Sequence, residues 1–281
     1  MQLYPIEAGN FKLDGGAMFG VVPKAIWHKT NPADANNLID IASRCLLIEK
    51  DHRLILVDTG MGNKQSDKFY SHYHRWGDFS LEKSIHKAGF SLNEITDVFL
   101  THLHFDHVGG ATFRKNEHLI ETLFPKATYW TNQKHWDWAT KPNPREKASF
   151  LNENLMPLQE SGQLNFVSTE INEQDFPFGI HFVDGHTEKQ MLPIIEYQNK
   201  TIAFMGDLIP TAGHIPIAYV MGYDTRPLLT LEEKAALLNK AADENWYLFL
   251  EHDAHNQVIT VKHTEKGVRL NKSFTFNQIF E

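Results

Sequence analysis

Three histidines and an aspartate stand within six positions of this chain, in the run Thr-His-Leu-His-Phe-Asp-His-Val-Gly-Gly at residues 101–110. With 16 histidines among 281 residues, such a cluster is not expected by chance. Imidazole and carboxylate together form a ligand set for zinc and other borderline metals. The cluster therefore predicts a metal site.

The spacing within the cluster has a geometric reason. The preceding residues, 97–100, form a short β-prone run that predicts a buried strand. Side chains two apart on an extended segment point the same way, so His102 and His104 can bind one cation as a pair. Asp106 and His107 fall in the following turn, where they can reach a second cation.

These residues resemble the first metal motif of the metallo-β-lactamase superfamily. Gly185-His186-Thr187, after a β-prone run, resembles the second motif, and Gly206-Asp207 resembles the segment with a bridging carboxylate. His252, at the end of the apolar run 247–250, matches the final ligand. The chain departs from a common family pattern after Thr187, where many members continue Pro-Gly-His and this chain has Glu188-Lys189-Gln190.

The resemblance implies two metal positions and assigns ligands to each. The first ion would be held by His102, His104 and His186, the second by Asp106, His107 and His252, and Asp207 would bridge both. We expect two divalent ions, Zn²⁺ first, with manganese, cobalt or iron as alternatives. Two cations that share one water yield hydroxide near neutral pH, so the implied chemistry is hydrolysis.

Asp58 ends the β-prone run 54–58 and matches a family aspartate that supports the metal cluster. Such a carboxylate orients a ligand histidine through the ring nitrogen that faces away from the metal. The alternative for Asp58 is a cap on the following turn.

Within the superfamily, the chain most resembles the quorum-quenching lactonases that open N-acyl-homoserine lactones by attack of a metal-bridging hydroxide. In that branch a tyrosine hydroxyl points at the substrate carbonyl. Tyr223 is the matching residue, with Tyr219 as the alternative. A role in packing alone is the other interpretation of Tyr223. Asp106 would also relay a proton to the leaving oxygen. Met18, Phe19 and Ile215 would line the acyl-chain pocket, with residues 10–20 forming either a flexible apolar flap or an ordinary loop.

The resemblance implies one α/β domain over residues 1–281, an αβ/βα four-layer sandwich with two mixed sheets face to face and helices outside. The residue pattern predicts hairpins at 41–48 with 54–58 and at 191–197 with 201–205. Helices are predicted over 80–89, 132–140, 145–155 and 231–245. Thr230 and Glu233 have the spacing of a capping box for the last of these. Edge strands are predicted at 258–261 and 273–276.

Composition narrows the partners. The net charge is −8 without a long run of one sign, so we do not expect nucleic acid as a partner. No basic segment precedes an apolar run at the N-terminus, and no stretch approaches a membrane span, so neither a signal peptide nor a membrane partner is indicated and we expect a cytoplasmic protein. The single cysteine, Cys45, rules out an internal disulfide and fits a buried structural thiol.

Two alternatives to lactone hydrolysis stay open. One is a phosphotriester (organophosphate) or aryl ester hydrolase of the same superfamily. The other, from a different class, is a non-enzymatic protein that binds a metal and a ligand without turnover. Dimers are common in the resembled branch, which leaves a homodimer as well as a monomer open.

Overall fold

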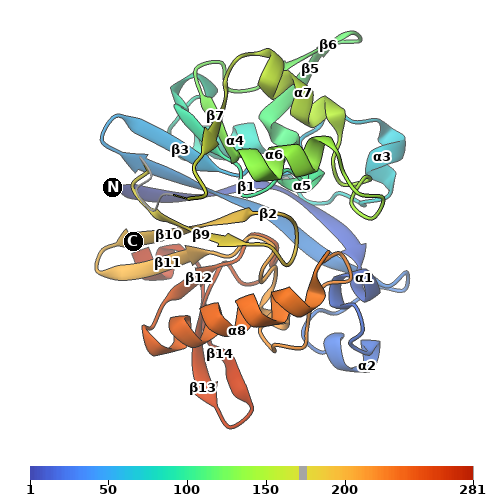
Figure 1. Ribbon diagram of the computed structural model, residues 1–281, viewed down its shortest axis with the longest axis vertical. Coiled ribbons are helices and arrows are strands. Elements are labelled where there is room, and N and C mark those ends of the chain that lie inside the picture. The colour runs from blue at the N-terminus through green and yellow to red at the C-terminus, as the bar shows by residue number, and fades with distance from the viewer. Residues whose placement is uncertain (171–175, 281) are drawn as a thin grey trace. The chain divides into compact units, whose positions relative to one another are not determined.

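The computed structural model describes residues 1–170 and 176–280 (Figure 1). Contacts divide the chain into two compact units: a first unit of Met1–Asn10 and Ser43–Asp175, and a second unit of Phe11–Ala42 and Phe176–Glu281. Two long strands, β1 (Gln2–Asp14) and β2 (Leu38–Lys50), have residues in both units. The expectation of one domain over 1–281 stays a prediction.

The strands of the first unit belong to a six-stranded sheet with the order β1-β2-β3-β4-β7-β8. Its remaining strands are β3 (Arg53–Val57), β4 (Asp97–Phe99), β7 (Thr128–Asn132) and β8 (Leu164–Val167). The hairpin predicted for β2 and β3 is confirmed, and β3, β4, β7 and β8 run parallel. Val57, Val98 and Phe99 are fully buried, as apolar runs in parallel strands usually are.

Helices connect the strands of the first unit. They are α3 (Asp67–Ser71), α4 (Leu81–Lys87), α5 (Phe105–Val108), α6 (Gln133–Thr140) and α7 (Asn152–Glu160), and a small hairpin joins β5 (Thr112–Asn116) to β6 (Leu119–Thr122). Apolar side chains of α4, α6 and α7 share one buried cluster with Val98 and Tyr129. The helices predicted over 80–89 and 132–140 are confirmed.

The helix predicted over 145–155 is only partly right, because α7 begins at Asn152. Before it, the Asn143 side-chain oxygen accepts the backbone N–H groups of Arg145 (2.9 Å) and Glu146 (3.2 Å). This local turn competes with helix formation, which is the usual behaviour of asparagine.

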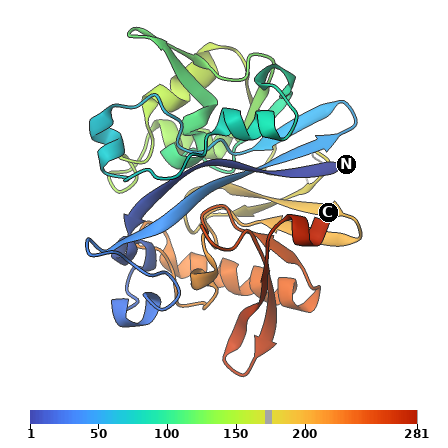
Figure 2. The same ribbon diagram turned by 180° about the vertical axis from the view of Figure 1, so that it is seen from behind.

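The second unit is built on a sheet with the order β14-β13-β12-β11-β10-β9. Its strands are β9 (Gly179–Val183), β10 (Gln190–Tyr197), β11 (Lys200–Phe204), β12 (Tyr247–Phe249), β13 (Val258–Thr264) and β14 (Gly267–Phe274). The β10–β11 hairpin is confirmed, and only β11 and β12 are parallel among these described pairs. Of the two predicted edge strands, β14 is an edge and β13 is not (Figure 2).

The parallel strands β11 and β12 are joined by a crossover that contains the long helix α8 (Pro227–Asp243). Its side chains Leu237, Leu238 and Ala241 pack in one buried cluster with Ala203 and Leu248 of the sheet. The short helices are α1 (Gly15–Phe19), α2 (Lys24–Trp27) and α9 (Asn277–Phe280). The expected fold class is therefore confirmed: a mixed α/β protein with two large mixed sheets and helices.

Two local expectations in the second unit are wrong. Residues 10–20 form neither a loop nor a flap: β1 continues to Asp14, whose side chain accepts the Ala17 N–H at 2.9 Å and starts α1. Thr230 is not an N-cap, because α8 begins with Pro227 and already includes it. Proline fits the first helical position, and it was the stronger start signal.

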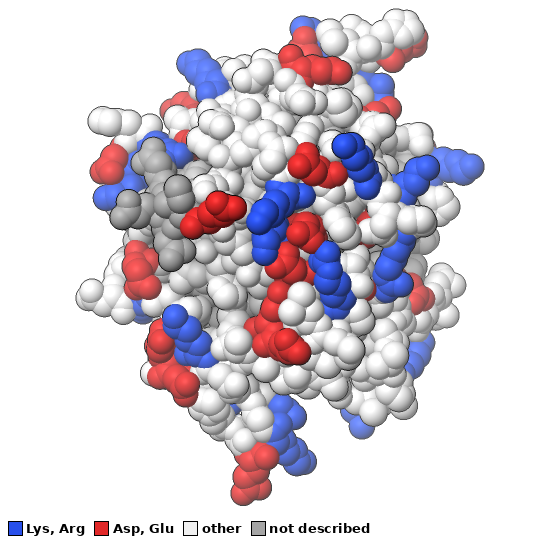
Figure 3. Space-filling view, in the orientation of Figure 1, with Lys and Arg blue, Asp and Glu red and all other residues white. Residues whose placement is uncertain are grey.

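The helices among the described residues are too short or too polar to span a bilayer. Lysine and arginine side chains intermingle with aspartate and glutamate on the face drawn in Figure 3.

Candidate metal centre

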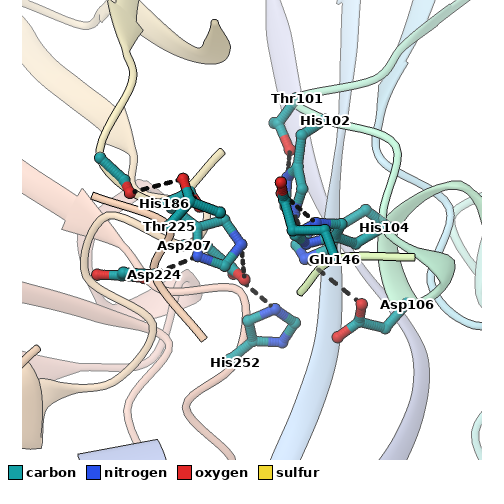
Figure 4. Close-up of polar contacts among 12 residues, drawn as sticks. Thr101, His102, His104, Asp106, Glu146, His186, Asp207, Asp224, Thr225 and His252 are labelled. Carbon is teal, nitrogen blue, oxygen red and sulfur yellow. Dashed lines mark hydrogen bonds and ion pairs between the residues drawn. The ribbon is translucent and has the colours of Figure 1, made fainter. Parts of the chain in front are cut away.

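His102 and His104 follow strand β4 on an extended segment that ends where α5 begins (Figure 4). Both side chains are buried, and His102 Nε2 lies 3.1 Å from His104 Nδ1. The other ring nitrogens have their own partners, since His102 Nδ1 lies 3.1 Å from the Thr101 hydroxyl and His104 Nε2 lies 3.3 Å from Glu146.

These outer partners can accept from the ring nitrogens that they face. The Thr101 hydroxyl donates to Asp58 at 2.6 Å, so its oxygen can accept from His102 Nδ1–H. The Glu146 carboxylate can accept from His104 Nε2–H. The two nitrogens that face each other then both carry a lone pair and no proton. The two lone pairs repel each other unless a cation lies between them. This donor set fits a metal ion.

Asp106 and His107 stand on α5, with His107 Nε2 4.0 Å from an Asp106 oxygen. His107 Nδ1 lies 3.0 Å from Asp58, which is fully buried and also accepts the N–H and hydroxyl of Thr101. Asp58 thus contacts one ring nitrogen of a predicted ligand, and its supporting role stays a prediction. That contact leaves His107 Nε2 for a metal.

In the second unit, the Asp207 carboxylate lies between two histidines (Figure 4). One oxygen is 3.1 Å from His186 Nε2, and the other is 2.9 Å from His252 Nε2. His186 Nδ1 lies 2.8 Å from Asp224, and His252 Nδ1 donates to the Ala42 carbonyl at 2.8 Å. Each histidine is therefore anchored on one side and turned toward Asp207 on the other, as metal ligands usually are.

The electrostatics of this half favour a cation. Burial lowers the pKa of His186, but the Asp207 and Asp224 carboxylates outweigh it and raise the pKa to about 10. A proton on His186 therefore occupies the place that a metal would take, and metal binding would release it. All seven predicted ligands occur in groups of histidines and carboxylates that could hold a metal ion. That they bind a metal stays a prediction.

Two supporting carboxylates, Glu146 and Asp224, escaped prediction from the sequence. Each contacts the far nitrogen of a predicted ligand histidine. They lie 42 and 38 residues from the histidines they contact, outside any motif. Only Asp224 had a signal, because it directly follows Tyr223.

The predicted pocket residues Met18, Phe19 and Ile215 are all buried. The Phe19 ring stacks on Trp27 and on His214, with centroid distances of 5.3 and 4.2 Å. This packing buries the ring that an apolar flap would expose. Their role as pocket walls stays a prediction.

Tyr223 lies in a turn before α8, and 39% of its surface is exposed. Its segment is tied to α1, because Gly222 N–H donates to the Ala17 carbonyl at 2.8 Å. Tyr219, the alternative to Tyr223, contacts the Phe19 ring edge-on instead. The structure thus brings the predicted pocket residues of α1 and the Tyr223 segment side by side.

His214 joins α1 to the turn at Thr211 and also escaped prediction. Burial lowers its pKa to about 3, although the bond to Met18 opposes the shift, so the ring is neutral. Its Nε2–H donates to the Met18 carbonyl at 2.8 Å, and its Nδ1 accepts from the Thr211 hydroxyl at 2.8 Å.

Comparison with known proteins gives the family. The model of the metallo-beta-lactamase superfamily matches residues 39–252. A probable metallo-hydrolase of Mycobacterium tuberculosis is 31% identical over an alignment of 120 residues, and the match covers 38% of this chain and 39% of that protein. The matched region thus spans well under half the length of this curated relative.

Two solved structures resemble the whole chain. A probable metal-dependent hydrolase from Staphylococcus aureus has a TM-score of 0.86 at 25% identity, covering 98% of both chains. AidC, a dizinc quorum-quenching lactonase in complex with a product, has a TM-score of 0.80 at 23% identity, covering 97% of this chain and 95% of its own. The family match extends over all seven predicted ligands, from His102 to His252, and this chain therefore belongs to the metallo-β-lactamase superfamily.

Proposed function

We propose that this protein is a dinuclear metal-dependent hydrolase that opens the ring of N-acyl-homoserine lactones. The observation that carries the proposal is the Asp207 carboxylate, whose two oxygens each face a different buried histidine. One carboxylate placed in this way can ligate two cations at once, as in two-metal hydrolytic sites.

The proposal keeps the ligand assignment that the family resemblance implies. The first ion takes His102, His104 and His186, the second takes Asp106, His107 and His252, and Asp207 is shared. Zinc is the first choice of metal, in keeping with the dizinc lactonase AidC. When bound, two such ions activate water near neutral pH and polarise a carbonyl oxygen.

The chain's own residues would do the rest of the work. Tyr223 would donate a hydrogen bond to the oxygen of the attacked carbonyl, where negative charge grows. Asp106 would hold the proton that the leaving ring oxygen needs. Met18, Phe19 and Ile215 would form the apolar wall along which an acyl chain lies.

The lactone is favoured over other esters by likeness to AidC, which was solved with an acyl-homoserine product. A lactone also uses both proposed catalytic groups, since ring opening develops charge on one oxygen and needs a proton on the other. The proposal includes a small-molecule substrate and a cytoplasmic location. It includes neither nucleic acid nor a membrane as a partner, and the protein would be a monomer or a homodimer.

The test is a turnover screen of purified protein whose metal content is measured. Acyl-homoserine lactones of several chain lengths are compared with a phosphotriester and an aryl ester, with Asp207→Ala as the inactive control. We expect the highest kcat/KM on a lactone. A faster phosphotriester reaction would favour the organophosphate alternative, and a fully loaded protein without any turnover would favour a binding protein.

A further inference from the structure

We propose that Glu146 is a positioning residue that holds His104 in the one tautomer able to bind the first metal ion. The inference rests on the proposed function, because it takes His104 as a ligand. Glu146 lies between α6 and α7, and its side chain is only 3% exposed. Burial of a carboxylate is costly unless its oxygens accept hydrogen bonds.

Both Glu146 oxygens face donors. Oε2 accepts from Trp138 Nε1 and from Asn143 Nδ2, each at 2.6 Å. The Asn143 amide orientation is determined independently, because its oxygen accepts the Arg145 and Glu146 N–H groups. Oε1 faces His104 Nε2 at 3.3 Å. If this oxygen accepts from the ring, as its neighbour Oε2 accepts from two donors, the proton of His104 lies on Nε2.

That proton position decides how His104 can act. With Nε2 protonated, His104 Nδ1 keeps its lone pair, and this is the atom that lies 3.1 Å from His102 Nε2. The opposite tautomer would put a proton where the cation must bind. Glu146 therefore selects the ligating nitrogen as well as the ring orientation.

The segment around Glu146 also fixes the backbone of the motif. Phe105 N–H donates to the Ser149 carbonyl at 2.9 Å, and the His104 ring packs on Phe150 at a centroid distance of 4.8 Å. Residues 146–150 thus contact His104 and its neighbour through a side chain, a carbonyl and a ring. This arrangement is a built support for one ligand.

A glutamine at position 146 could not replace the glutamate. Its single oxygen could accept from His104 or from the Trp138 and Asn143 pair, and its NH₂ would then face a donor on the other side. Glu146→Gln keeps the size of the side chain and leaves at least one donor without an acceptor. Removing such a supporting group from a metal site typically costs about 10- to 100-fold in metal affinity.

The experiment is a zinc titration against a chromogenic chelator with wild type, Glu146→Gln and a matched control, Glu153→Gln. Glu153 is a more exposed carboxylate on α7 that pairs with Arg114 at 3.1 Å. We expect Glu146→Gln to weaken one of two ions about 10- to 100-fold, with the other ion and the melting temperature of the zinc-free protein little changed. The control should bind both ions as wild type does.

A second readout is the tautomer of His104, measured by ¹⁵N NMR in wild type with and without zinc. A proton on Nε2 in both forms supports the proposal even if the variant fails to fold. Unchanged affinity for both ions in a folded Glu146→Gln, or a His104 proton on Nδ1, would overturn it. A wild type that bound no zinc would instead overturn the proposed function, while the tautomer would still test Glu146.

Discussion

Asp106 and Tyr223 act on different oxygens of the lactone in the proposed reaction, and their loss should therefore have different signatures. The carbonyl oxygen gains negative charge during attack, and the ring oxygen leaves as an alkoxide. Tyr223, partly exposed before α8, would serve the first. Asp106, on α5 beside His107, would serve the second.

Tyr223→Phe removes the hydroxyl and keeps the ring. We expect metal content to stay intact and kcat on a lactone to fall, by at most the roughly 100- to 1,000-fold that one oxyanion donor supplies. Steady-state kinetics on metal-quantified protein checks this. A variant as fast as wild type would return Tyr223 to a packing role, and Tyr219→Phe would then be the next substitution.

Asp106→Asn should cost more, because it removes a ligand oxygen's charge as well as a proton carrier. A general acid typically contributes about 100- to 10,000-fold. The loss should be smallest on a nitrophenyl ester, whose leaving group needs no proton. Equal losses on a lactone and on a nitrophenyl ester would leave Asp106 a ligand only.

At the scale of elements, helix α8 holds two loops of the second unit. Glu233 accepts the N–H groups of Asp184 and Gly185, just before His186, at 2.7 and 3.0 Å. Lys234 donates to three carbonyls of residues 216–219, at 2.7 to 3.3 Å. Thr230 donates to Asp224, which in turn contacts His186. These three helix positions lie on one face, because they are three and four residues apart.

Lys234 makes stability depend on pH. Burial lowers its pKa to about 7, with Asp224 opposing the shift, whereas the ordinary value is 10.5. Between these values the unfolded chain binds a proton that the folded chain does not, so this lysine's contribution to stability rises with pH by up to about 1.4 kcal/mol per unit. Below pH 7 both states are protonated and the contribution is constant.

Urea unfolding at pH 7, 8 and 9 compares wild type with Lys234→Met. The free energy of unfolding of wild type should increase relative to that of the variant as pH rises. Lys240→Met, on the exposed side of the same helix, controls for the loss of a positive charge. A difference between wild type and Lys234→Met that is constant across this range would contradict the shifted pKa.

The same helix shows what a sequence pattern can and cannot predict. Its existence followed from the spacing of its apolar residues, and the helices over 80–89 and 132–140 were predicted from the sequence as well. The first residue of the helix was predicted wrongly, because the Thr230–Glu233 spacing of a capping box is a local signal and does not show which groups these side chains bind. Those side chains instead bond to loops 6 to 49 residues away, which only the folded chain brings near. The supporting carboxylates Glu146 and Asp224 escaped prediction for the same reason, because the histidines they contact are far away in the sequence.

At the scale of the whole molecule, the predicted ligands divide between the two units. The first unit holds His102, His104, Asp106 and His107, and the second holds His186, Asp207 and His252. Their order and residue types were predictable, because metal motifs at strand ends are short and local. The division of the chain into units was not, since it depends on how β1 and β2 share their residues.

The most direct measurement of the central claim is the metal content of purified protein by elemental analysis. We predict two transition-metal ions per wild-type chain. Asp207→Ala should lower the occupancy of both positions, because Asp207 faces a histidine with each oxygen. A wild type that holds fewer than two ions, or an Asp207→Ala variant that keeps two tightly bound ions and full activity, would contradict a dinuclear centre bridged by this carboxylate.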